Sequence, residues 1–211
     1  AAVADNGATA LMQTAFSGIA AAVRTALAAG WCGLEATNSD GDTAFLLACY
    51  KGHAECMQLL AEAGCNTAAK DNYGTTALMH TACSGIAAAV RTALAAGWCG
   101  LEATSSNGDT AFLVACNQGH VDCMQLLAEA GCNTAAVANG SKTARDIAQA
   151  AGNSAAVQWL LEEFAERERR AQIAEAELMA MLDSESATTN RSTVRQGEQA
   201  QRKKEKRRRQ Q

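Results

Sequence analysis

The chain has 211 residues, a formal net charge of −4, 48% hydrophobic residues and no proline. Residues 1–163 hold 6 Lys or Arg against 14 Asp or Glu, a net of −8, whereas residues 164–211 hold 12 against 8, a net of +4. The acidic body disfavours nucleic-acid binding outside the C-terminal part. The most apolar run, at 19–29, carries Arg24 and is too short to cross a membrane, so we expect no membrane partner.

An internal repeat organises most of the chain. Segments 5–71 and 72–138 align without a gap, and 53 of the 67 aligned positions are identical. Each block divides again, because Thr-Ala pairs recur every 33 or 34 residues, beginning at Thr9, Thr43, Thr76, Thr110 and Thr143. A period of this length predicts a solenoid whose units bury their apolar faces only against their neighbours. Such a stack presents long surfaces and no single deep pocket, which favours binding over catalysis.

Each repeat unit predicts two short helices. In the segment 41–64, Thr43 can cap a first helix, and Gly52 breaks it. A second run with apolar residues at helical spacing follows, and Gly64 ends it in a position suited to the left-handed conformation. The polar linker to Gly74 predicts a projecting loop.

These motifs resemble the ankyrin repeat. The matching segments are GATALMQTA, GDTAFLLACYKGH, GTTALMHTA, GDTAFLVACNQGH and SKTARDIAQAAGN. The family's Thr-Pro-Leu-His is replaced here by Thr-Ala-Leu-Met or Thr-Ala-Phe-Leu. The resemblance implies an all-α helix-turn-helix solenoid with projecting loops over residues 1–163. Its five repeats are expected at 5–38, 39–71, 72–105, 106–138 and 139–163.

The C-terminal part departs from the repeat. The second helix of the fifth unit meets no closing glycine and is predicted to continue as an extension over 164–182. From Asp183 to residue 211 the composition is polar, charged and free of aromatic residues, which predicts a disordered basic tail. The basic residues of this tail are Arg202, Lys203, Lys204, Lys206, Arg207, Arg208 and Arg209. They suit a nuclear-import signal, a weak nucleic-acid contact, or a tail that only keeps the protein solvated.

The 14 differences between the two blocks indicate a binding surface. Twelve fall in the projecting loops or first helices, which line the concave binding face in the ankyrin family. Drift at tolerant surface positions explains the same pattern, so both interpretations stay open. We predict a protein partner that contacts residues at loop tips or on first helices: Phe16, Asp42, Tyr50, Lys51, Tyr73, His80, Asp109, Asn117 and Gln118.

Cysteine and tryptophan each allow two interpretations. Cys49, His53 and Cys56 are soft metal ligands and recur 67 residues later, but Gly-His is the ordinary turn of the family, so we expect no metal there. The nine cysteines follow the duplication and are expected to be reduced, which predicts a cytoplasmic or nuclear protein. Trp31 and Trp98 could anchor a partner, but we expect them to pack beneath the longer loops.

The sequence shows no catalytic constellation. It contains no Walker loop or dinucleotide-binding fingerprint, and no Ser-His-Asp set stands out. We therefore predict an interaction module or scaffold, monomeric, without catalytic residues, cofactor or small-molecule substrate. Two alternatives stay open. Because the chain starts without Met, it could be the targeting or adaptor region of a larger polypeptide that holds a catalytic domain. Alternatively, the tail could contact nucleic acid.

Overall fold

The computed structural model of the chain describes residues 7–30, 33–98 and 100–208, and between 183 and 207 it describes the backbone alone. The chain divides into two compact units, residues 1–160 and 161–211. This boundary lies within the last helix, three residues before the one expected at 163. The limits expected for the individual repeats stay a prediction.

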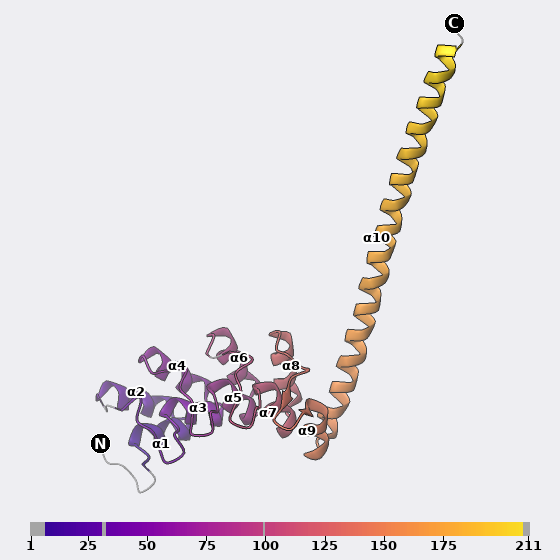
Figure 1. Cartoon of the computed structure of the whole chain (residues 1–211). Helices are drawn as coiled ribbons and strands as arrows, with labels where there is room; N and C mark the ends of the chain where they lie inside the picture. Colours follow the sequence, from indigo (N-terminus) through magenta and orange to yellow (C-terminus); the bar gives the residue numbers. More distant parts are fainter. Residues whose placement is uncertain (1–6, 31–32, 99, 209–211) are drawn as a thin grey trace. The chain divides into compact units, whose positions relative to one another are not determined.

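Residues 1–160 form paired helices in two layers (Figure 1). Each first helix contacts the first helix of the next pair, and the second helices pack against one another alongside. The pairs are α1 Ala10–Ser17 with α2 Ala20–Ala28, α3 Ala44–Lys51 with α4 Ala54–Glu62, α5 Ala77–Ser84 with α6 Ala87–Ala95, α7 Ala111–Gln118 with α8 Val121–Glu129, and α9 Ala144–Ala150 with the start of α10 Ser154–Arg208. The predicted helix-turn-helix repeat is therefore confirmed.

Threonine caps start every first helix, as the sequence predicted. The backbone N–H of Met12 donates to Oγ1 of Thr9 at 3.2 Å, and the N–H of Leu46 donates to Oγ1 of Thr43 at 3.3 Å. The same arrangement recurs at the three later units. Because these helices are only seven or eight residues long, satisfying one of their four free N–H groups matters for their stability.

Left-handed glycines end the first helices and seat the next repeat. Gly18 has a φ of 73°, and a Cβ there would lie 2.5 Å from the imidazole ring of His53. Nε2 of His53 lies 3.1 Å from the carbonyl oxygen of Phe16, one repeat earlier. Gly85 and His120 repeat this arrangement in the second block. These histidines therefore tie neighbouring turns together, which supports the turn interpretation of the Cys-His-Cys pattern.

The core runs along the stack as one cluster of small and medium side chains. Phe45 and Phe112 are its largest fully buried residues, and alanine fills many of the remaining positions. Trp98 is half-buried and meets the edge of Phe45 with ring centroids 5.1 Å apart. The expected packing role of Trp98 is thus confirmed, whereas Trp31 lies outside the described residues.

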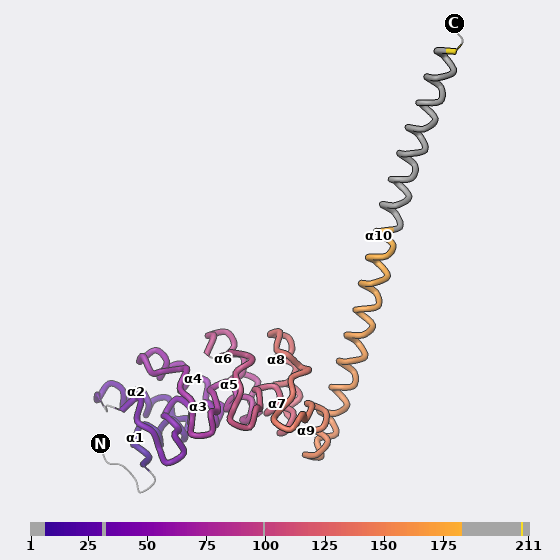
Figure 2. The backbone as a smooth tube through the Cα atoms, in the orientation of Figure 1, coloured from indigo at the N-terminus to yellow at the C-terminus, as the bar shows by residue number. Residues whose placement is uncertain are grey.

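The projecting loops follow one another along the first-helix side of the stack (Figure 2). Backbone hydrogen bonds link their tips, from Asn72 N–H to Asp40 O at 2.9 Å and from Ser106 N–H to Tyr73 O at 2.9 Å. The last loop adds a short antiparallel pair of strands, β1 Val137–Ala138 and β2 Lys142–Thr143. We call the surface formed by the first helices and these loops the loop face.

The C-terminal unit is a single helical segment. α10 continues past Leu182 to Arg208, where the sequence predicted a disordered tail from Asp183. Residues 183–208 lack proline and are rich in Ala, Gln, Glu, Lys and Arg, so their backbone can keep helical geometry without a packed core. Among the residues that the structure describes, no helix is both long and apolar enough to cross a membrane.

Candidate functional site

A groove opens on the loop face over the first three repeats. Its volume is about 770 Å³, and its walls come from α1, α3, α5 and the loops that precede α3 and α5. Five of the predicted partner-binding residues line it: Phe16, Asp42, Tyr50, Tyr73 and His80. The fold thus brings together side chains from three repeats that the sequence could place only by their position within a unit.

Exposed aromatic side chains form the upper part of this groove. Phe16, Tyr50 and Tyr73 are 44%, 43% and 61% exposed. The ammonium of Lys51 lies 4.4 Å from the ring centroid of Phe16 and 5.2 Å from that of Tyr50. Lys51 therefore holds two aromatic rings from neighbouring repeats beside each other through cation–π contacts. We call Phe16, Tyr50, Lys51 and Tyr73 the aromatic rim.

The predicted residues of the second block occupy a different place. Asp109 and Asn117 line a second groove, of about 380 Å³, together with Lys142. Asn117 and Gln118 are exposed, and Nε2 of Gln118 lies 3.7 Å from Sγ of Cys83. The second groove has no aromatic side chain in its lining. The two blocks thus present different chemistry on equivalent surfaces.

His80 is the one predicted contact residue that the structure buries. It is only 8% exposed, although its position on a first helix predicted an outward side chain. The ring of Tyr50 covers it edge-on, with centroids 5.9 Å apart. The correction follows from the neighbouring repeat, because α3 and its preceding loop supply the atoms that cover the imidazole.

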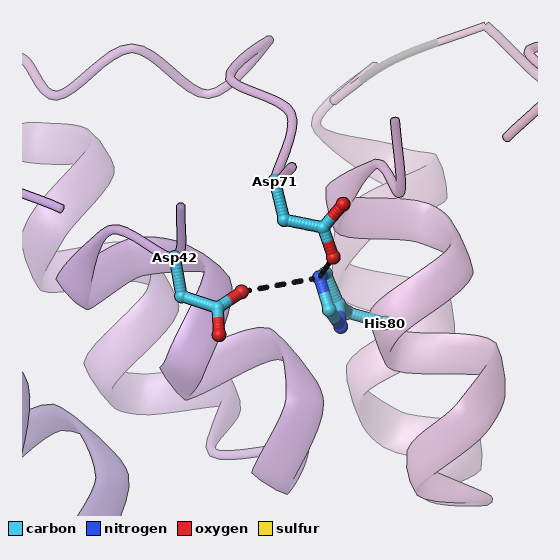
Figure 3. Close-up of side chains that lie close together, drawn as sticks. All are labelled: Asp42, Asp71 and His80. Atoms are coloured by element: carbon cyan, nitrogen blue, oxygen red, sulfur yellow. Dashed lines mark ion pairs between the residues drawn. The ribbon is translucent and has the colours of Figure 1, made fainter. Parts of the chain in front are cut away.

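Beneath the aromatic rim, His80 faces two aspartates that come from two successive loops (Figure 3). Nε2 of His80 lies 3.3 Å from Oδ2 of Asp71 and 3.6 Å from Oδ1 of Asp42. The side chains of Asp42, Asp71 and His80 are 15%, 6% and 10% exposed. We call these three residues the Asp-Asp-His cluster.

Local hydrogen bonds orient both carboxylates. Oδ1 of Asp71 accepts from the backbone N–H groups of Tyr73 and Thr75, at 2.9 and 2.7 Å. Oδ2 of Asp42 accepts from Nδ2 of Asn38 at 3.4 Å. Each aspartate therefore uses one oxygen to stabilise its own loop and turns the other toward His80.

The atoms at the centre of the cluster lack hydrogen bonds. Oδ1 of Asp42 and Nε2 of His80 are the two buried side-chain polar atoms without a hydrogen-bond partner among the described residues. A buried polar group left in this state costs about 1–3 kcal/mol. Burial raises the pKa of Asp42 against the opposing charge of His80, and burial lowers the pKa of His80 against the two carboxylates. The neutral imidazole is thus favoured.

The cluster occurs at the junction of the two blocks and not in the second groove. Positions 67 residues later hold Asp109, Ala138 and Ile147, so one carboxylate remains and the other ligating side chains are lost. Asp109 has Lys142 as its nearby charge, and burial raises the pKa of Asp109. Sequence reasoning did not single out Asp71. Its signal was present, because Asp71/Ala138 and Gln13/His80 are two of the 14 differences between the blocks.

The basic tract of the tail is outside what the structure describes in side-chain detail. Of its residues, Arg208 is described and exposed, whereas the side chains of 202–207 and all of Arg209 lie outside the described part. The import, nucleic-acid and solvation interpretations stay predictions.

The fold defines a helical repeat protein whose loop face carries grooves. The family of ankyrin repeats, in three copies, matches residues 11–98 and 87–171, which together span 161 of the 211 residues. The chain therefore belongs to the ankyrin repeat family. These repeats are in general protein-interaction modules, which fits the long exposed surface of the stack. A search of curated proteins finds no match.

Proposed function

We propose that the protein is an interaction module that binds another protein along the loop face of its ankyrin stack, with the aromatic rim as the anchor. The observation that carries this proposal is the gathering of Phe16, Tyr50 and Tyr73, each at least 43% exposed, around one groove. Monomeric proteins gain nothing in stability from leaving such rings in water, and aromatic side chains dominate the energetics of protein interfaces.

The chemistry of the groove indicates what kind of partner segment it accepts. Asp40, Asp42 and Asp71 line the groove below the rings. An apolar side chain flanked by a basic one would place its apolar part between the rings and its charge near the carboxylates. The proposed partner therefore presents a hydrophobic residue next to Lys or Arg. No catalytic residue, cofactor or small-molecule substrate enters this function.

Affinity capture with the full chain from a native extract, followed by binding measurements on the captured protein, tests the proposal. Tyr50→Ala and Tyr73→Ala should each weaken binding by about 1–2 kcal/mol, because interface aromatics are typical hot spots. The matched control is Glu55→Ala, which removes an exposed side chain of the second-helix layer whose ion pair with Arg24 is also exposed. If Glu55→Ala weakens binding while both tyrosine variants bind as the parent does, the partner uses the opposite face and the assignment is wrong.

A further inference from the structure

The Asp-Asp-His cluster has the features of a site rather than of a structural ion pair. In an ion pair between His and Asp, the ring N–H donates to a carboxylate oxygen. Here Nε2 of His80 points between two oxygens and makes no hydrogen bond to either. The ligating atoms of the three side chains lie within 4.8 Å of one another, and no other group of three His, Cys, Asp or Glu side chains in the described residues is so arranged.

We propose that Asp42, Asp71 and His80 bind one divalent transition-metal ion of the zinc class. The inference does not depend on the proposed partner, because it concerns three side chains of this chain alone.

The distances match such an ion. Zinc binds imidazole nitrogen and carboxylate oxygen at about 2.0–2.2 Å, so two ligand atoms of a tetrahedral ion lie about 3.3–3.6 Å apart. The distances from Nε2 of His80 to the two carboxylate oxygens are 3.3 and 3.6 Å. An ion placed among the three atoms would give a partner to both polar atoms that have none.

The donor set decides the class of ion. One imidazole and two carboxylates are mixed nitrogen and oxygen donors, which suit zinc and its first-row neighbours. Calcium and magnesium select oxygen ligands, and an imidazole at the centre of the site disfavours both. The hydrogen bonds of Asp71 to the loop backbone and of Asp42 to Asn38 would hold the carboxylates in place, as outer hydrogen bonds do in metal sites.

The position of the cluster gives the ion a further property. All three residues line the groove of about 770 Å³, so coordination positions that the protein leaves open face this groove. Three protein ligands with an open position are typical of zinc sites that accept an outside ligand. The ion would thus offer the groove a water molecule or a binding position for a carboxylate or imidazole.

Metal titration of the full chain tests the proposal directly. Protein stripped with a chelator, reduced and dialysed should take up about one equivalent of zinc, measured by calorimetry and by metal analysis after dialysis. Cobalt should replace zinc and give visible bands of a tetrahedral ion without the near-ultraviolet thiolate bands that cysteine ligands would produce. Magnesium and calcium chloride should give no uptake. Protein that takes up neither zinc nor cobalt, or cobalt spectra with thiolate bands alone, would overturn the proposal.

The duplication supplies the variants and their control. His80→Gln and Asp71→Ala install the residues that the other block carries at these positions, Gln13 and Ala138. Each should weaken zinc binding more than about 100-fold, since loss of an outer partner alone costs 10–100-fold. Asp109→Asn alters the equivalent of Asp42 in the second block and should leave zinc binding unchanged. Uptake that persists in both ligand variants places the ion elsewhere.

A measurement on the unaltered chain covers the case in which a variant fails to fold. The protein has three histidines, and two of them, His53 and His120, contact main-chain carbonyls. In spectra of the histidine rings recorded during zinc titration, the signals of the buried His80 should shift and those of the other two should stay. Shifts confined to His53 and His120 would refute the assignment.

Discussion

Alanine at Gly52 should destabilise the stack far more than alanine at Gly64, although both glycines have left-handed backbone. Gly52 has a φ of 71° and Gly64 a φ of 85°, and this conformation costs a residue with a Cβ about 1–2 kcal/mol. The difference comes from the next repeat. A Cβ on Gly52 would lie 2.5 Å from Cδ1 and 2.9 Å from Cβ of Ile86, whereas a Cβ on Gly64 meets nothing within 4 Å.

The Cβ of Ile86 is fixed to its backbone, so side-chain rotation alone cannot relieve the clash, and the two repeats must separate. Overpacking of this kind costs about 1–3 kcal/mol. We therefore expect Gly64→Ala to lower the free energy of unfolding by about 1–2 kcal/mol, and Gly52→Ala to lower it by roughly 2–5 kcal/mol.

Urea unfolding of the full chain, followed by circular dichroism, measures both changes, provided that the m-values agree. The second block repeats the experiment, because a Cβ on Gly119 would lie 2.8 Å from Asn153 and a Cβ on Gly131 meets nothing. Equal losses at Gly52 and Gly64 would refute the argument that close contact between repeats, and not backbone strain alone, selects glycine at the end of the first helix.

Three further outcomes are expected. Burial raises the pKa of Cys65 and of Cys116 to about 12, so both thiols should react with iodoacetamide at pH 8 roughly 10³-fold more slowly in the folded protein than in urea, as followed by mass spectrometry; equal rates would show that these thiols are not protected. A chain ending at residue 71 should melt without the cooperativity of residues 1–182 in a calorimetric scan, because nearest-neighbour interfaces supply much of a solenoid's stability; a sharp transition of the short chain would contradict this. Replacing residues 202–209 with Ser and Gly should move a fluorescent fusion from nucleus to cytoplasm if they form an import signal, and should raise partner affinity at low salt if the tail screens the acidic stack; no change in either leaves them a solvated tail.

The sequence was sufficient for the features that recur within one repeat. The capping threonines, the glycines after the first helices and the packing of Trp98 follow from local chemistry and from the 33- or 34-residue spacing, and each appears in the structure. The Asp-Asp-His cluster could not be predicted this way. Its members come from two loops and a helix of different repeats, so their meeting depends on how far each repeat is rotated and shifted against the next.

Composition also misled at the C-terminal end. The residues after Leu182 are polar and charged, which is typical of disorder, yet the same residue types are good helix formers. Polarity shows that such a segment has no core of its own, but it does not decide whether the backbone is helical. The extension of α10 to Arg208 illustrates the difference.

The near identity of the two blocks creates a problem of register during folding. A helix pair that stacks on 39–71 has a near-copy elsewhere in the same chain and in every other molecule, and misassembly is a characteristic failure of repeat proteins. If the segment that follows residue 138 docked where residue 72 belongs, Ile147 would take the place of His80. Asp42 and Asp71 would then face an aliphatic side chain in a buried position and lose their histidine. The junction between the blocks thus distinguishes the native alignment from a slipped one that the shared interfaces would otherwise tolerate.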